Sequence, residues 1–215
     1  MLRNPNGLSY AVMSLLGVTA AADVFALVAT FGVRSDLRGG LADHPDPAGY
    51  EGSLALAAAW FAQGLLLVAT AIVFIVWFHR LRRNADVWTP DLQGRGPGWA
   101  IGAWFVPVAN LWIPRGIAAD IWRASRPDPY GPDRSGEFVL LNAWWTLFAV
   151  DAVMGRVAAR MFDMAETVDG LVDATGWLLA SDATNLAAAV LAILFVRRLT
   201  SMQHVKATGM IPASQ

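Results

Sequence analysis

The chain has 215 residues, of which 56% are hydrophobic and only 15% are charged, and its mean hydropathy is +0.44. Soluble domains are typically about 45–50% apolar and about 25% charged, so this composition points to lipid as the solvent. A net charge of −1 gives no reason to expect a nucleic-acid partner, and the lack of cysteine excludes disulfides and thiol chemistry. We expect residues 1–215 to form a single membrane domain without a metal site or cofactor, because the three histidines lie far apart.

Four apolar stretches are long enough to cross a bilayer, which takes roughly 20 residues. Backbone groups cannot stay unpaired in hydrocarbon, so each stretch is predicted to be a helix. The stretches are residues 11–33, 54–78, 138–155 and 175–196. The predicted fold class is therefore all-α, an integral membrane four-helix bundle.

The first stretch has two interpretations. Arg3, the apolar run and the alanines at 20–22 also suit a signal peptide with its cleavage site. The apolar run, however, continues past these alanines to Val33. The pattern therefore favours a membrane anchor that is not cleaved.

A fifth apolar stretch, residues 99–114, is short and contains Pro107 and Pro114, which interrupt a helix. Counting it as a span would give an odd number of spans and would send the C-terminus to the other side from the N-terminus. We therefore expect residues 99–125 to form a re-entrant or interfacial Trp/Pro-rich segment, which is tolerated where protein buries it or where it lines a cavity.

The charge pattern sets the orientation. Residues 79–137 hold eight arginines and the C-terminal tail holds three basic residues, whereas residues 34–53 and 161–174 each hold four acidic residues. The positive-inside rule then places the Arg-rich loop and both termini in the cytoplasm. We expect a multi-pass protein of the cell membrane.

The end of the Trp/Pro-rich segment, residues 116–125, predicts a short amphipathic helix. Asp120 and Arg123 are three residues apart on it and can pair. Its apolar side chains are expected to contact the membrane: Ile117, Ile121 and Trp122. Residues 126–137 contain three Pro and two Gly and predict a solvated loop.

Residues 98–125 read GWAIGAWFVPVANLWIPRGIAADIWRAS. They resemble an actinobacterial domain-of-unknown-function family of small four-span membrane proteins, whose members share a Trp-, Pro- and Asn-rich block between two helical hairpins. The resemblance covers most of the chain and implies the topology given above. It implies no activity, so the function has to be inferred from the residues.

Three carboxylates inside predicted spans are the candidate catalytic residues: Asp23, Asp151 and Asp182. An ionisable group in hydrocarbon costs at least about 2.5–3.5 kcal/mol, which makes it a functional hypothesis by default. A carboxyl that stays neutral in an apolar site can act as a general acid. The competing interpretation is structural, with each Asp bonded to a neighbouring helix. Asp151 would then pair with Arg156 or Arg160.

Ten tryptophans are the second feature. Some fit an interfacial aromatic belt, but a ring face also attracts a cation by up to about 2 kcal/mol when desolvated. The candidate substrate-binding residues are aromatic and amide side chains: Trp60, Gln63, Trp104, Asn110, Trp112, Trp144 and Asn185. Asn110 alternatively caps backbone that the prolines free. Arg115 contacts an anionic headgroup or substrate, or extends to the interface.

An acid beside aromatic rings can protonate an alkene or epoxide and stabilise the carbocation that follows. We therefore expect a membrane-embedded enzyme acting on a lipophilic, isoprenoid substrate, a terpene cyclase of the protonation type. The chain has no DDxxD motif for Mg²⁺-diphosphate, no P-loop and no nucleophile elbow. The alternative is a non-enzymatic membrane protein, such as a transporter subunit, scaffold or envelope regulator, whose Asp residues are structural. The expected partners are the lipid bilayer and a lipophilic small molecule.

Overall fold

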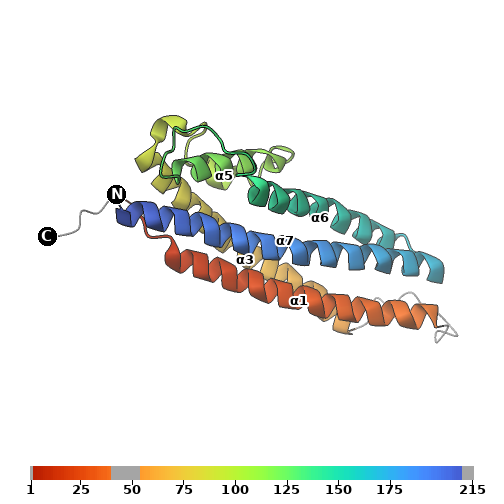
Figure 1. The fold of residues 1–215 in the computed structure, drawn as a ribbon. Helices are drawn as coiled ribbons and strands as arrows, with labels where there is room; N and C mark the ends of the chain where they lie inside the picture. Colours follow the sequence, from red (N-terminus) through yellow and green to blue (C-terminus); the bar gives the residue numbers. More distant parts are fainter. Residues whose placement is uncertain (1, 40–53, 210–215) are drawn as a thin grey trace. The chain divides into compact units, whose positions relative to one another are not determined.

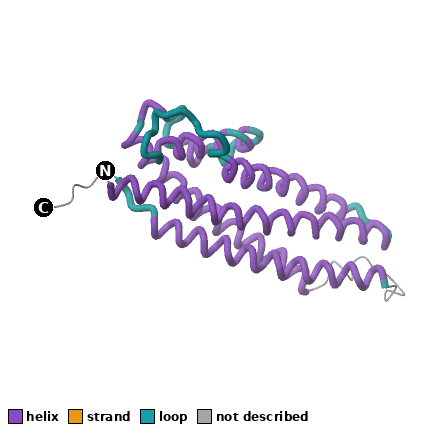
Figure 2. The backbone as a smooth tube through the Cα atoms, in the orientation of Figure 1, coloured by secondary structure: helices purple, strands orange, loops and turns teal. Residues whose placement is uncertain are grey.

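Residues 2–39 and 54–209 are described by a computed structural model, which gives the backbone alone at residues 54–56, 59 and 60. All regular structure within these residues is helical, in agreement with the predicted all-α class (Figure 1). The long helices are α1 (Asn6–Arg38), α3 (Leu54–Trp88), α6 (Val139–Asp163) and α7 (Val168–Gly209). Shorter helices lie between α3 and α6, where Figure 2 shows much of the loop: η1 (Pro90–Leu92), α4 (Trp99–Gly102), η2 (Ala109–Leu111) and α5 (Ile113–Ala124).

Among the described residues, three helices are long and apolar enough to cross a membrane: Asn6–Arg38, Phe61–Trp88 and Val168–Gly209. They contain most of the predicted spans 11–33, 54–78 and 175–196 and extend beyond them. The fourth predicted span, 138–155, lies in the 25-residue helix α6, which is not one of the three. The structure therefore makes a membrane location plausible, and crossing by α6 stays a prediction.

The ends of the long helices follow from the sequence. Helix α3 ends at Trp88, shortly before Pro90, because proline and the residue preceding it disfavour a continuing helix. Helix α7 begins after Thr167, whose Oγ1 accepts a hydrogen bond from the Gly170 N–H at 3.1 Å. This is an N-cap, which satisfies one of the free donors of the first helical turn.

The chain forms two compact units. The first unit consists of Met1–Leu15, Ala69–Trp145 and Leu191–Gln215, and the second of Leu16–Val68 and Thr146–Val190. Helices α1, α3, α6 and α7 each contribute residues to both units.

An aromatic core stabilises the first unit. Trp77 and Phe195 are fully buried, and the ring of Phe195 stacks on that of Trp144 with centroids 4.9 Å apart. Phe74 contacts the rings of Trp77, Trp104 and Trp144 at centroid distances of 5.2–5.7 Å. These rings come from α3, α6, α7 and the Trp/Pro-rich segment, so the aromatic core joins these four parts of the chain. Each such ring pair contributes about 0.5–1.5 kcal/mol beyond the burial of its surface.

A buried polar network also belongs to the first unit. The side-chain N–H of Gln203 donates to Leu81 O at 3.1 Å and to Ser125 Oγ at 3.4 Å, while its Oε1 accepts from Asn84 at 2.9 Å. Asn84 in turn bonds both the N–H and the carbonyl of Arg3, each at 2.8 Å. The amide of Gln203 is thus satisfied on both sides, and the N-terminal segment is tied to α3.

The core of the second unit includes a cluster of four buried side chains: Leu37, Phe162, Leu171 and Ala174. Beside it, Arg34 donates to the carbonyl of Val172 and to Thr175 Oγ1, the latter at 3.0 Å. The guanidinium therefore ties α1 to the first turns of α7.

The Trp/Pro-rich segment is broken as its prolines predict. Helix α4 stops at Gly102, and Val108 has a positive φ of 66° at the centre of a γ-turn. Helix α5 starts at Ile113 and carries Pro114 in its first turn, where the missing N–H leaves no bond unmade. The predicted short helix is confirmed, and so is the pairing of Asp120 with Arg123 at 3.2 Å.

The expectation that the apolar face of this short helix contacts the membrane is wrong. Ile117, Ile121 and Trp122 are only 1%, 0% and 5% exposed. The ring of Trp122 stacks on that of Phe195, with centroids 6.1 Å apart and an interplanar angle of 15°. An apolar helix face buries against protein as readily as against lipid, and here α7 supplies the partner.

Candidate functional site

Four of the predicted site residues come together in the second unit: Asp23, Gln63, Asp182 and Asn185. We call this group the carboxylate–amide cluster. Asp23 is fully buried, and the side-chain N–H₂ of Asn185 donates to its two carboxylate oxygens at 3.1 and 3.2 Å. The side-chain N–H₂ of Gln63 donates to Asp23 Oδ1 at 3.1 Å and to Asp182 Oδ1 at 3.3 Å. One amide therefore bridges two carboxylates.

Helical spacing positions the cluster. On α1, Asp23, Ala26 and Thr30 follow at three- and four-residue steps and are all at most 2% exposed. On α7, Asp182 and Asn185 are three residues apart and share a face. The polar faces of these two helices therefore meet within the second unit.

Asp151 is bonded separately. It accepts a hydrogen bond from Ser181 Oγ at 3.0 Å, which links α6 to α7. The predicted pairing with Arg156 or Arg160 is wrong, since no described ion pair includes Asp151 and Arg156 donates to the carbonyl of Ala152 instead. The reason is geometric: a residue five positions along a helix lies roughly 140° around it.

The other predicted site residues lie elsewhere. Trp104 and Trp144 belong to the aromatic core of the first unit. Trp112 is 55% exposed, and Asn110 is half-buried in η2, where its backbone N–H donates to Val106 O at 3.0 Å. The side chain of Trp60 lies outside the described residues. The carboxylates and the described aromatic candidates thus belong to different units.

Two polar residues of α5, Arg115 and Asp120, are held by contacts with other parts of the protein. Arg115 donates to Asn142 Oδ1 with two of its guanidinium nitrogens, at 2.6 and 3.2 Å, so it links α5 to α6. Burial raises the pKa of Asp120, although the hydrogen bond from the Gly94 N–H and the charge of Arg123 act in the opposite direction. Both side chains serve the packing of α5.

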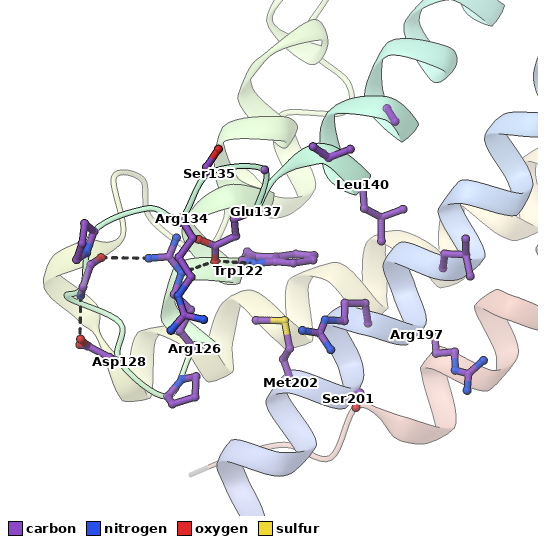
Figure 3. A pocket seen from close by; sticks show the side chains of 18 of the residues that line it. Trp122, Arg126, Asp128, Arg134, Ser135, Glu137, Leu140, Arg197, Ser201 and Met202 are labelled. Atoms are coloured by element: carbon purple, nitrogen blue, oxygen red, sulfur yellow. Dashed lines mark hydrogen bonds and ion pairs between the residues drawn. The ribbon is translucent and has the colours of Figure 1, made fainter.

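A cleft of about 1420 Å³ in the first unit was not expected from the sequence. It lies between the loop 126–137 and the facing parts of α6 and α7, and we call it the loop cleft (Figure 3). Its cationic lining residues are Arg126, Arg134, Arg197 and Arg198. Its aliphatic lining residues include Leu140, Ala143, Leu191 and Leu194.

Ion pairs order the loop 126–137 beside this cleft, although its Pro- and Gly-rich sequence predicts a solvated loop. Arg126 contacts Glu137 at 2.5 Å and Asp133 at 2.6 Å, and Arg123 contacts Asp133 at 2.9 Å. The two guanidinium groups hold the pKa of Asp133 well below its usual range. Asp128 accepts the N–H groups of Tyr130 and Gly131 at 3.2 Å and so shapes a turn. Among the described residues, no group of three or more acidic or histidine side chains could hold a metal ion.

The residues that line the loop cleft indicate only membrane topology when the sequence is considered alone. Arg197 and Arg198 follow an apolar run, and Arg126 and Arg134 lie in a Pro-rich loop. Such arginines occur at the end of many membrane spans. Nothing in the local sequence indicates that residues 126–137 lie against α7.

Residues 40–201 match the model of a family described as Domain of unknown function (DUF4328). The match includes Gln63, Asp151, Asp182 and Asn185 but begins after Asp23. It agrees with the resemblance to an uncharacterised family, whereas the source and the number of spans are not part of the finding. No curated protein and no solved structure matches the chain.

Proposed function

The chain belongs to the DUF4328 family, and we propose that it is a four-span membrane protein, with both termini in the cytoplasm, that binds and exchanges a proton at Asp23 and Asp182. The observation that carries the proposal is the amide of Gln63, which donates to both carboxylates at 3.1 and 3.3 Å. Ionisable groups that face a membrane bundle interior are typical of proton and ion pathways.

Electrostatics argues that this pair carries one proton. Two negative charges that share one amide repel each other strongly where little water screens them, so carboxylates in such a site share a proton. Asp23 accepts three amide contacts, two from Asn185 and one from Gln63. Within the described contacts, Asp182 accepts only the longer bond from Gln63. The negative charge therefore belongs on Asp23 and the proton on Asp182.

A proton relay suits the surroundings better than catalysis does. A relay needs donors and acceptors in sequence, whereas an enzyme needs a substrate pocket at the acid. Neither the loop cleft nor a second pocket at Phe31 and Leu179 is lined by Asp23 or Asp182. We therefore favour a proton-coupled role, such as a transporter subunit.

Infrared difference spectroscopy on the full chain in lipid vesicles tests the proton site. Exposed carboxyls stay ionised when the pH is changed only within a range well above the ordinary aspartate pKa of about 3.9. A carbonyl stretching signal in that range therefore reports a carboxyl that its surroundings keep protonated. Asp182→Asn is expected to remove that signal, and Gln63→Leu is expected to shift it. The control Asp163→Asn changes an exposed acid at the end of α6 and leaves the signal intact. A signal that survives Asp182→Asn and Asp23→Asn unchanged refutes the proposal.

The terpene cyclase stays a second prediction, in which Asp23, Asp151 or Asp182 is the acid. Membranes that contain the protein are supplied with linear prenylated substrates, and the products are compared with those of Asp23→Asn, Asp151→Asn and Asp182→Asn. Loss of a cyclised product in one of these variants supports acid catalysis. Identical products from the wild type and all three variants exclude it.

A further inference from the structure

The loop cleft has an apolar part and a cationic part. Leu140, Ala143, Leu191 and Leu194 belong to α6 and α7, inside the stretches predicted to lie in hydrocarbon. The cationic residues come directly after the second of these stretches or from the loop 126–137. The cleft therefore changes from apolar to cationic at the predicted boundary between hydrocarbon and headgroups.

Three of the cleft arginines are available to a ligand. Arg126 is neutralised, since it contacts Glu137 and Asp133 within 2.6 Å. Arg134, Arg197 and Arg198 are exposed, and no ion pair joins them to an acidic residue in the part of the chain that the structure describes. Figure 3 labels Arg134 on the loop side of the cleft and Arg197 on α7.

The acidic lining residues cancel only part of this positive charge, since two acids face four arginines. Glu137 contacts Arg126 at 2.5 Å and accepts the Trp122 indole N–H at 3.0 Å. Asp128 accepts two backbone N–H groups of its own turn. The cleft is thus complementary to an anion at its polar end.

The volume of the loop cleft is large enough for a lipid headgroup together with part of an acyl chain. Pockets for small molecules are typically about 300–1,000 Å³, and the loop cleft measures about 1420 Å³. A small polar anion would leave the aliphatic wall wet, whereas an acyl chain would cover it. Guanidinium groups match phosphate oxygens geometrically and bind them with paired hydrogen bonds.

We propose that the loop cleft binds one anionic glycerophospholipid of the bilayer. Its phosphate lies against Arg134, Arg197 and Arg198, and its acyl chains lie along Leu140, Leu191 and Leu194. This site is built from the first unit alone and is independent of the proton centre proposed in the second unit.

Native mass spectrometry of the purified full chain in detergent tests this site. The protein is titrated with phosphatidylglycerol and, separately, with phosphatidylcholine. We expect one phosphatidylglycerol to bind at least roughly tenfold more tightly than phosphatidylcholine, since arginines attract the net negative charge of the phosphatidylglycerol headgroup. The triple variant Arg134→Gln/Arg197→Gln/Arg198→Gln is expected to lose this preference.

The control variant Arg38→Gln/Arg156→Gln/Arg160→Gln removes the same charge from exposed arginines outside the loop cleft and should keep the preference. Ala143→Phe, which fills the apolar part, should weaken phosphatidylglycerol binding with all three cleft arginines present. Glycerol phosphate at equal concentration should not displace the lipid.

Three results would overturn the proposal. If the triple variant still prefers phosphatidylglycerol, the cleft arginines do not hold the phosphate. If Ala143→Phe has no effect, the attraction is that of a basic surface for any headgroup. If glycerol phosphate displaces the lipid, the site binds a soluble phosphate compound.

Discussion

Asp23 is surrounded by amide groups that all donate to it. Replacing it by leucine removes the acceptor of the Asn185 N–H₂ and one of the two acceptors of the Gln63 N–H₂. Each buried donor left unpaired costs about 1–3 kcal/mol. Asp23→Leu is therefore expected to lower the thermal midpoint of unfolding in detergent well below that of the wild type. Val24→Ala, at an exposed neighbouring position, is the control and should change it little. Equal midpoints for the two variants would mean that the carboxylate–amide cluster does not form.

Asp133 gives a prediction about pH. Because Arg123 and Arg126 lower its pKa in the folded protein, its ion pairs stabilise the loop fully above the ordinary aspartate value of about 3.9 and weaken as the pH falls through the lower folded value. Hydrogen exchange of residues 127–134, corrected for the intrinsic effect of pH, should stay slow down to about pH 4 and accelerate below it.

Asp133→Asn serves as the control for that measurement. It removes the charge at every pH, so its loop should exchange rapidly near neutral pH as well. A loop that remains protected in the wild type at the lowest pH at which α7 is still protected would contradict the assignment of these ion pairs.

Individual site residues could be predicted where helical spacing alone decides their direction. Asp182 and Asn185 are three residues apart on α7, so they share a face of that helix. This face and the buried face of α1 that carries Asp23 point toward each other. The partner of Asp151 could not be predicted, because a hydroxyl on another helix, that of Ser181, competed with two nearby arginines. Local sequence contains no information on which helix stands opposite.

At the level of elements, Val108 is the most informative position. Its φ of 66° and ψ of −50° form a γ-turn, in which the Ala109 N–H donates to Pro107 O at 2.7 Å. Such a positive φ is unfavourable for a β-branched residue by roughly 1–3 kcal/mol. The side chain is 63% exposed, so glycine there relieves strain and gives up little packing. Val108→Gly is therefore expected to be neutral or stabilising in thermal unfolding.

Val106→Gly is the matched comparison, because Val106 is 40% exposed but has no positive φ. Glycine there only increases the freedom of the unfolded chain, which costs about 0.5–1 kcal/mol. A Val108→Gly protein that is as strongly destabilised as Val106→Gly would show that the segment does not take this conformation.

In the Trp/Pro-rich segment, the sequence predicts the local backbone but not the tertiary contacts. Pro107 and Pro114 predict the broken backbone, since proline is excluded from a helix interior. The amphipathic pattern predicts helix α5 and its apolar face. What that face contacts is a tertiary fact, because hydrocarbon and the aromatic ring of Phe195 are equally apolar partners for Trp122.

At the scale of the whole molecule, composition predicts the solvent of the chain and the positions of its long helices. Three of the four predicted spans fall in helices that are apolar enough to cross a membrane. Helix α6 is the exception, because Asn142, Asp151 and Arg156 interrupt its apolar surface. The prediction that α6 crosses the membrane therefore rests on the distribution of charged residues over all the loops and the C-terminal tail.

The natural chain contains no cysteine, so single cysteines can report this topology without background. We propose Asn4→Cys, Met164→Cys and Thr208→Cys, placed before α1, between α6 and α7, and near the end of α7. With four spans and cytoplasmic termini, a membrane-impermeant maleimide added to intact cells labels Met164→Cys alone. Labelling of all three after the cells are opened is the control for reactivity.

If α6 does not cross, the pattern reverses in a defined way. The turn at residue 164 then stays in the cytoplasm, and α7 carries the C-terminus outside, so Thr208→Cys is labelled in intact cells and Met164→Cys is protected. That arrangement would place Arg197 and Arg198 on the outer face, against the positive-inside rule. The loop cleft combines Arg134 of the loop before α6 with Arg197 and Arg198 of α7, so these residues have to lie on one side of the membrane. The labelling of residue 208 therefore decides the number of spans and also tests the loop cleft.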